Sequence, residues 1–173
     1  MPAVSTIADP DSFRESMSRL AAAVHIVTAS QEGRRFGMTM TAASSLCTDP
    51  MSILISVDRQ ATTHEAILRS RRLCLNILGP GHNDLAARFS GALGHRGEER
   101  FEMGDWFGNE EHPPMLRDAA AALQCELVDV HAFGTHNVML CAVRHIVLGP
   151  RPAALVYANR QYGSVQHIAD KGV

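Results

Sequence analysis

The segment GMTMTAASSLCTDP, residues 37–50, has an unusual composition for a strand. Residues 38–43 read Met-Thr-Met-Thr-Ala-Ala, which has the period of two that is typical of a strand, and Asp49-Pro50 ends the pattern. Strands that only fill a core favour Val, Ile and aromatic residues. This one carries small side chains, many with hydroxyl groups. Two interpretations stay open: a tight barrel corner, or one wall of a site for a flat, phosphorylated ligand.

The segments on either side of residues 37–50 are also strand-like. VHIVTAS (24–30) precedes it across a turn at Gly33, so the two are predicted to form a hairpin. MSILISVD (51–58) follows the Asp49-Pro50 turn as another strand. Further strands are predicted over 72–79, 122–133, 136–149 and 153–158.

Three helices are predicted between and before these strands. Ser12 with Glu15, and Thr62 with Glu65, have the spacing of a capping box, so helices are expected over 12–22 and from 62 to about 71. Asn83 begins a short third helix with Leu85 and Phe89 on its buried side. Residues 91–117 form a long irregular connection, in which Trp106 and Phe107 are a candidate covering element.

The order of these elements predicts a mainly β protein. Many strands, few helices and no regular βαβ alternation favour a closed antiparallel barrel with a few flanking helices. The expected domain organisation is an N-terminal tail (1–11), one domain (12–165) and a C-terminal tail (166–173).

Composition excludes several function classes. A net charge of −2 and 5% aromatic residues give no basic surface or stacking platform for nucleic acid. The four cysteines include no CxxC pair, and the nine histidines include no HExxH. His25 and His145, in apolar strands, are interpreted as core or edge histidines with satisfied hydrogen bonds. No secretory signal or membrane-spanning run is visible, which predicts a cytoplasmic protein with reduced thiols and no membrane contact.

The segment DRQATTH (58–64) is the clearest candidate for binding an anion. It places Arg59, Thr62 and Thr63 just before a helix, whose first N–H groups and positive potential attract phosphate. The alternative is an ordinary capped surface helix. The chain has no GxGxxG, GxxxxGK[ST] or GxSxG motif, so it lacks the standard phosphate loops and a nucleophile elbow.

The order of the motifs FRESMSRLAAAVHIVTA, GMTMTAASSLCTDP, ISVDRQATTHEAI, LCLNIL, ERF, GTHNVMLCAV and LVYANRQYG resembles the short-chain flavin reductases. The likeness covers about residues 12–163 and is strongest to the reductase of 4-hydroxyphenylacetate 3-monooxygenase type. Three positions depart from the family pattern. Met51 stands where many members have a second proline, Cys47 where serine is common, and Thr135 where aspartate is frequent.

The resemblance implies an FMN-binding split barrel of Greek-key type, a homodimer, and NADH-dependent, or possibly NADPH-dependent, reduction of FMN or FAD. Hydride would pass from C4 of the nicotinamide to N5 of the flavin, and a separate monooxygenase would receive the reduced flavin. Two alternatives remain: a split-barrel flavoprotein that retains its flavin, as pyridoxamine phosphate oxidases do, and a non-enzymatic flavin- or haem-binding module.

The resemblance also implies site residues. The candidate catalytic residue is His136, which would lie beside the nicotinamide and orient it; the alternative is a hairpin histidine without a role. The expected cofactor-binding residues are Thr39, Met40, Thr41, Ala42, Ser44, Ser45, Val57, Asp58, Arg59, Ala61, Thr62, Thr63, Tyr157, Arg160 and Tyr162.

Overall fold

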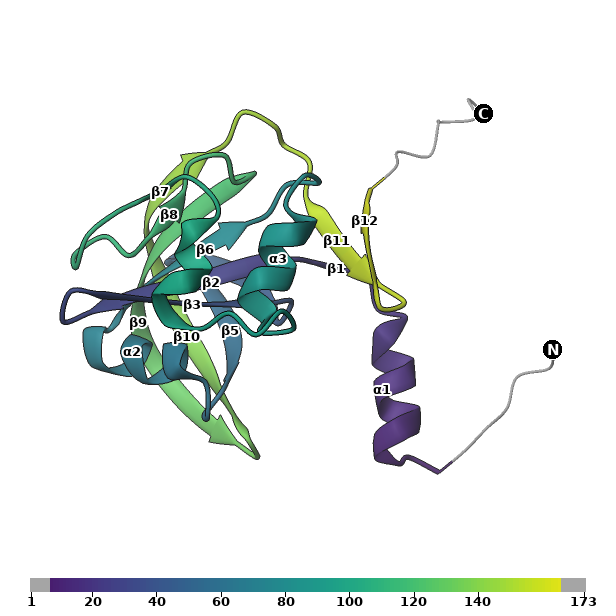
Figure 1. The fold of residues 1–173 in the computed structure, drawn as a ribbon. Coiled ribbons are helices and arrows are strands. Elements are labelled where there is room, and N and C mark those ends of the chain that lie inside the picture. The colour runs from purple at the N-terminus through teal and green to yellow at the C-terminus, as the bar shows by residue number, and fades with distance from the viewer. Residues whose placement is uncertain (1–6, 166–173) are drawn as a thin grey trace, which may run out of the picture.

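A seven-stranded antiparallel sheet dominates the computed structural model, which describes residues 7–165 (Figure 1). The strand order is β3-β2-β6-β9-β10-β5-β4. The strands are β2 (His25–Gln31), β3 (Arg34–Met40), β4 (Ala43–Thr48), β5 (Met51–Asp58), β6 (Arg72–Ile77), β9 (Ala121–Phe133) and β10 (His136–Leu148). The mainly β prediction is confirmed. In the described part of the chain no ladder joins the edge strands β3 and β4, so strand pairing does not close the sheet into the expected barrel.

The segment that opened the sequence analysis is two strands rather than one. β3 pairs with β2 from Gln31–Arg34 to His25–Met40, which confirms the predicted hairpin. The chain then bends at Thr41 and Ala42, where the N–H of Ala43 donates to the carbonyl of Thr41 at 2.9 Å. After the bend, β4 pairs with β5 at the other edge of the sheet. A period of two continues across such a bend, so the alternation alone did not reveal it.

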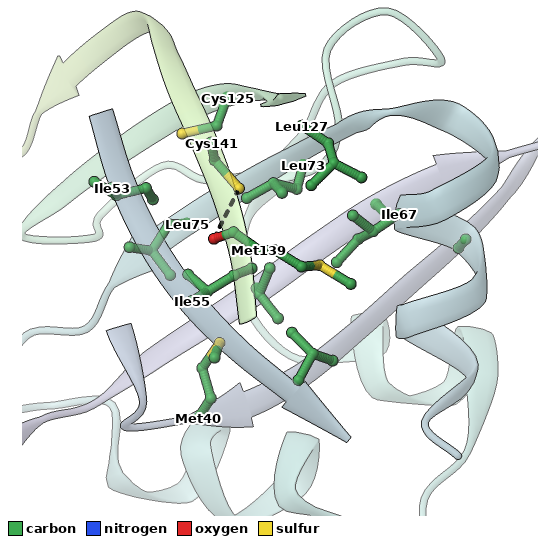
Figure 2. Close-up of a cluster of buried hydrophobic side chains, with 14 of the residues drawn as sticks. Met40, Ile53, Ile55, Ile67, Leu73, Leu75, Cys125, Leu127, Met139 and Cys141 are labelled. Atoms are coloured by element: carbon green, nitrogen blue, oxygen red, sulfur yellow. Dashed lines mark hydrogen bonds between the residues drawn. The ribbon is translucent and has the colours of Figure 1, made fainter. Parts of the chain in front are cut away.

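The concave side of the sheet encloses the main hydrophobic cluster (Figure 2). Ile55 on β5, Leu73 on β6 and Met139 on β10 are fully buried there. Helix α2 (Thr62–Ser70) adds Ala66 and Ile67. Each fully buried aliphatic side chain stabilises the fold by about 1.5–3 kcal/mol.

A second cluster lies under the long connection between α3 and β9. Leu85 and Phe89 of α3 (Asn83–Ser90) are buried as predicted. The connection holds a 3₁₀ helix, η1 (Gly97–Glu102), and two short paired strands, β7 (Trp106–Phe107) and β8 (Met115–Leu116). The rings of Phe89, Phe101 and Trp106 contact one another with centroids 5.0–5.3 Å apart. The irregular connection is therefore packed onto the body of the protein.

Both predicted capping boxes are wrong. α1 (Pro10–Ser18) is capped by Asp9, whose carboxylate accepts from the N–H groups of Asp11 and Ser12. The helix therefore begins inside the predicted tail and ends before residue 22. α2 begins at Thr62 as expected, but Ala61 is its N-cap and no side chain caps it. The spacing of Thr62 and Glu65 fits a capping box only if the helix starts one residue later.

A small lobe stands beside the sheet. It consists of the three-stranded sheet β1 (Ala22–Ala23), β11 (Leu155–Ala158) and β12 (Gln161–Ser164), with α1 projecting away from the body (Figure 1). Strand β12 was not predicted. Residues 1–6 of the predicted N-terminal tail and all of the C-terminal tail, 166–173, lie outside the described residues. Within residues 7–165, every helix is too short or too polar to cross a bilayer.

Replacing Gly149 should destabilise the fold strongly. A Cβ at Gly149 would lie 1.7 Å from the carbonyl oxygen of Ala119, which is backbone and cannot move aside as a side chain could. We expect Gly149→Ala to lower the free energy of unfolding by about 3 kcal/mol, as overpacking of a tight contact does. Gly163→Ala is the matched control, because a Cβ there meets nothing within 4 Å. Equal urea midpoints for the two variants would contradict this packing.

Candidate functional site

A groove of about 420 Å³ brings together two predicted segments that are far apart in the chain. Thr39, Met40 and Thr41 at the end of β3 line one side, and residues of the β11–β12 hairpin line the other. The hairpin contributes Tyr157, Arg160 and Tyr162. The sequence did not single out the remaining residues of the groove, which are Val24, Ala87, Ser90 and Ala92.

Aromatic and hydroxyl groups dominate this groove. The rings of Tyr157 and Tyr162 lie with centroids 5.2 Å apart, and burial, with a smaller effect of Tyr157, raises the pKa of Tyr162. The Thr39 hydroxyl donates to the carbonyl of Ala86 at 2.6 Å, so it is left as an acceptor. Arg160 forms an ion pair with Glu15 of α1 at 3.1 Å. The groove thus offers flat apolar faces with polar edges, which suits a conjugated ring system.

The second part of the site is the start of α2. The N–H of Ala61 donates to the Asp58 carbonyl, and the Asp58 carboxylate accepts from the N–H of Gln60 at 2.9 Å. These bonds turn the chain from β5 into the helix. The N–H of His64 donates to the Ala61 carbonyl at 3.0 Å, but no side chain caps the helix. The N–H groups of Thr62 and Thr63 therefore remain available to an anion, and the helix dipole favours negative charge there.

The Thr41–Ala42 bend joins the two parts. The Ala42 carbonyl accepts from the N–H of Ser56 on β5 at 2.9 Å, two residues before Asp58. Thr41 itself lines the groove. The groove and the α2 start therefore share one backbone segment, whose residues Thr41 and Ala42 are exposed.

His136 lies next to the α2 start, opposite Asp58 in the β10–β5 ladder. It is exposed, and its Nδ1 is 2.8 Å from the hydroxyl of Thr135. Gly134 has φ +55°, which a residue with a side chain rarely adopts, and it makes the turn before His136. Arg59 fastens this turn: its N–H donates to the Thr135 carbonyl at 3.0 Å, and its Nη2 donates to the Gly134 carbonyl at 2.7 Å.

Several predicted site residues lie elsewhere or face inward. Val57 and Thr63 are buried, and Ala61 packs against the main cluster. Met40 is also largely buried, although it lines the groove. Ser44 and Ser45 lie past the bend on β4 and line a different cavity. Trp106 and Phe107 line a separate hollow beside Arg34 and do not line the groove.

Comparison with known proteins identifies the family of this chain. A model of the flavin reductase like domain matches residues 17–166. The FMN reductase (NADH) RutF of Methylorubrum populi is 37% identical over 154 residues, which span 89% of this chain and 75% of that protein. The FMN reductase (NADH) RutF of Pseudomonas syringae pv. syringae is 37% identical over 150 residues, or 87% of this chain and 83% of that one.

Solved structures agree with the sequence relatives. A candidate flavin reductase from Haemophilus somnus 129PT superimposes with a TM-score of 0.86 at 33% identity, covering 91% of this chain and 100% of that chain. The nitrilotriacetate monooxygenase component B of Mycobacterium thermoresistibile has a TM-score of 0.83 at 26% identity, covering 94% and 89%. The family model spans most of the chain, and the relatives match it over most of their own length. The chain belongs to the flavin reductase-like domain family.

Proposed function

We propose that this protein is an NADH-dependent flavin reductase that reduces FMN and releases it to a separate monooxygenase. The proposal rests on one observation: the Thr41–Ala42 bend joins the groove, which is lined by aromatic and hydroxyl side chains, to the uncapped start of α2. Family membership supports it, since relatives at 37% identity are FMN reductases that use NADH. A neighbour in fold is a component of a nitrilotriacetate monooxygenase, which supports the partner.

The residues of the site fit a flavin. The groove has room for part of a ring system, and Tyr157 and Tyr162 offer aromatic faces. The first N–H groups of α2 hold the phosphate, which needs donors rather than a metal. The hydroxyls of Thr39 and Thr41 face the ribityl chain. FAD also fits this scheme, because its diphosphate can use the same helix start.

The chain's own residues align the two reactants and exclude water. Hydride transfer from the nicotinamide to the flavin is the chemistry of the bound molecules, and the protein supplies proximity and orientation. His136 positions the nicotinamide, and Arg59 fixes the turn that carries it. Hydride transfer does not require a general acid, which agrees with the exposed position of His136 and the lack of a catalytic triad motif.

The proposal includes the finer architecture that the resemblance implies. The sheet curls into a split barrel, with the split between β3 and β4. The domain spans residues 12–165 together with the first turn of α1, which begins at Pro10. The four cysteines are free, which suits the reducing cytoplasm.

The exposed apolar side chains of α1 support a homodimer. Phe13 and Met17, which are spaced i, i+4 on α1, are 64% and 46% exposed, and Leu20, just past the end of the helix, is 60% exposed. Large apolar side chains gathered on a projecting helix are typical of a protein interface. In the dimer, α1 packs on the second subunit, and its Glu15–Arg160 ion pair links this interface to the groove.

Phe13→Glu should weaken the dimer. The substitution removes the apolar burial of Phe13 from the interface, which weakens the dimer by about 1.5–3 kcal/mol. This loss corresponds to roughly a tenfold or larger rise in the dissociation constant of the dimer. Light scattering across a dilution series measures it. Arg14→Gln, on the polar side of the same helix, is the control and should leave the dimer intact. A wild-type protein that is monomeric and fully active at working concentration would contradict the interface.

His136→Ala should raise the Michaelis constant for NADH more than it lowers turnover. A residue that binds the nicotinamide equally before and during hydride transfer contributes uniform binding, and its loss leaves kcat nearly unchanged. Because the variant loses one hydrogen bond to the nicotinamide, we expect KM for NADH to rise about fivefold to tenfold. Flavin affinity should hardly change. If kcat collapsed while KM stayed constant, His136 would take part in the chemistry itself.

Steady-state NADH oxidation by the purified chain tests the proposed function. The rate should depend on added FMN, and NADPH should be the poorer donor. Gel filtration, which shows whether flavin stays on the protein, distinguishes a flavin reductase from the two alternatives. A protein that keeps one flavin per subunit and oxidises NADH negligibly would be an oxidase-like flavoprotein, and one that binds flavin without any turnover would be a binding module.

A further inference from the structure

A buried hydrogen bond joins the first turn of α2 to the start of β10. The Nε2 atom of His64, the third residue of α2, lies 2.9 Å from the Nδ2 atom of Asn137, the second residue of β10. Both residues are buried, with 6% and 7% of their surface exposed. The bond therefore connects two elements that are far apart in the chain and that each carry one part of the proposed site.

The geometry of this bond assigns the protonation state of His64. An amide nitrogen only donates, so Nε2 of His64 accepts, and the neutral ring carries its proton on Nδ1. Burial lowers the pKa of His64, and the charge of Arg59 lowers it further, while Asp58 and Glu65 oppose the shift. The neutral imidazole is therefore the form that accepts from Asn137 at neutral pH.

Packing alone does not account for Asn137 at this position. Its Oδ1 atom is buried and has no partner among the described residues, so the bond to His64 is the one hydrogen bond that its side chain makes there. Two apolar side chains would fill the space without an unpaired atom, and replacing both members of a buried polar pair is often neutral or stabilising. A buried polar group that is only partly satisfied calls for a functional explanation.

The pair lies between the two binding parts of the proposed site. His64 directly follows Thr62 and Thr63, whose N–H groups are free for the phosphate at the start of α2. Asn137 directly follows His136, the residue proposed to orient the nicotinamide. The bond therefore fixes the phosphate donors of α2 relative to the strand that carries His136.

We propose that His64 and Asn137 are positioning residues for the flavin phosphate, and that their bond sets where the first turn of α2 presents its N–H groups. The proposal deepens the flavin reductase function proposed above and rests on it. A hydrogen bond is directional, whereas apolar contacts are not and let a helix shift along its neighbours. The pair acts through the helix and does not itself touch the phosphate.

Binding of FMN and of riboflavin to His64→Leu, measured by fluorescence quenching without NADH, tests the proposal. Riboflavin has the same ring system but no phosphate. We expect FMN to bind about tenfold more weakly than to the wild type, the value of one misplaced bond to a charged phosphate, and riboflavin affinity to stay within about twofold. Unchanged FMN affinity, or an equal loss for both ligands, would overturn the proposal.

Two further variants serve as controls for His64→Leu. His64→Gln places an amide oxygen near the position of Nε2, so it keeps an acceptor for Asn137 and should bind FMN more tightly than His64→Leu does. His145→Leu removes an exposed histidine from the same strand as Asn137 and should bind both flavins as the wild type does.

The double variant His64→Leu/Asn137→Leu separates positioning from stability, and it replaces His64→Leu if that variant does not fold. It removes both polar groups, so its urea midpoint should equal or exceed that of His64→Leu. Its FMN affinity should stay low, because no directional bond replaces the lost one. Recovery of FMN affinity together with stability would show a structural role only and overturn the inference. A wild-type chain that does not reduce FMN would instead refute the proposed function, which turnover measures separately.

Discussion

Thr62→Pro should weaken FMN binding by about 1.5–3 kcal/mol while leaving the fold intact, because it removes one N–H donor to a charged phosphate. Thr62 is the first residue of α2, where proline is well tolerated. The preceding Ala61 has φ −70° and ψ 133°, the extended conformation that a following proline requires. The substitution therefore removes a main-chain donor from the proposed phosphate site without breaking the helix.

Two controls isolate the main-chain donor. Thr62→Val keeps the N–H group and removes only the hydroxyl, so its FMN affinity should stay closer to that of the wild type. Riboflavin lacks the phosphate, and its affinity should be the same in Thr62→Pro and wild type. Fluorescence quenching measures both ligands. A variant that bound FMN and riboflavin with unchanged affinities would place the phosphate elsewhere, for example at Arg160.

Asn76→Leu should lower the free energy of unfolding by about 3–5 kcal/mol, since it removes three hydrogen bonds that a buried side chain makes to backbone groups. Asn76 is fully buried on β6. Its Nδ2 donates to the carbonyls of Ile26 and Pro114 at 3.1 and 3.3 Å, and its Oδ1 accepts from the N–H of Leu116 at 2.8 Å. The Asn76 side chain thus holds the segment with β7 and β8 against the sheet.

Urea denaturation of Asn76→Leu and of Asn83→Leu measures this effect. Asn83 is an exposed asparagine at the start of α3, and its replacement should change stability little. The large loss is expected only where the side chain is buried and its partners are backbone groups. A loss below about 1 kcal/mol for Asn76→Leu would mean that the connection holds to the sheet without these bonds.

The main strands could be predicted from sequence because their patterns are strong. Runs such as MSILISVD (51–58) carry the β-branched and aliphatic residues that a half-buried strand needs, and β5 matches that range. The bend at Thr41–Ala42 could not be predicted, because small residues continue the alternation on both sides of it. The capping boxes failed for a related reason: Asp9, just outside the expected helix, is the better cap for α1.

The sequence predicts the separate segments of the site, but only the fold shows which of these segments lie side by side. The strand end at Thr39–Thr41 and the hairpin residue Tyr162 do line one groove. Strand β12 was missed because its turn, Asn159-Arg160, has positive φ at both residues, and arginine is not a usual signal for such a turn. Ser44, which is expected to contact the flavin, lies on β4 past the unpredicted bend and lines a cavity other than the groove.

The transfer of reducing equivalents to free FMN is the central claim, and anaerobic mixing of the purified chain with NADH and FMN tests it most directly. FMN loses its visible absorbance when it is reduced, so the reaction is followed without a partner enzyme. We predict that catalytic amounts of the protein bleach all the added FMN, with one NADH consumed per flavin, and that gel filtration then separates reduced flavin from protein. Bleaching no faster than in the absence of protein, or limited to one flavin per subunit, would contradict the account.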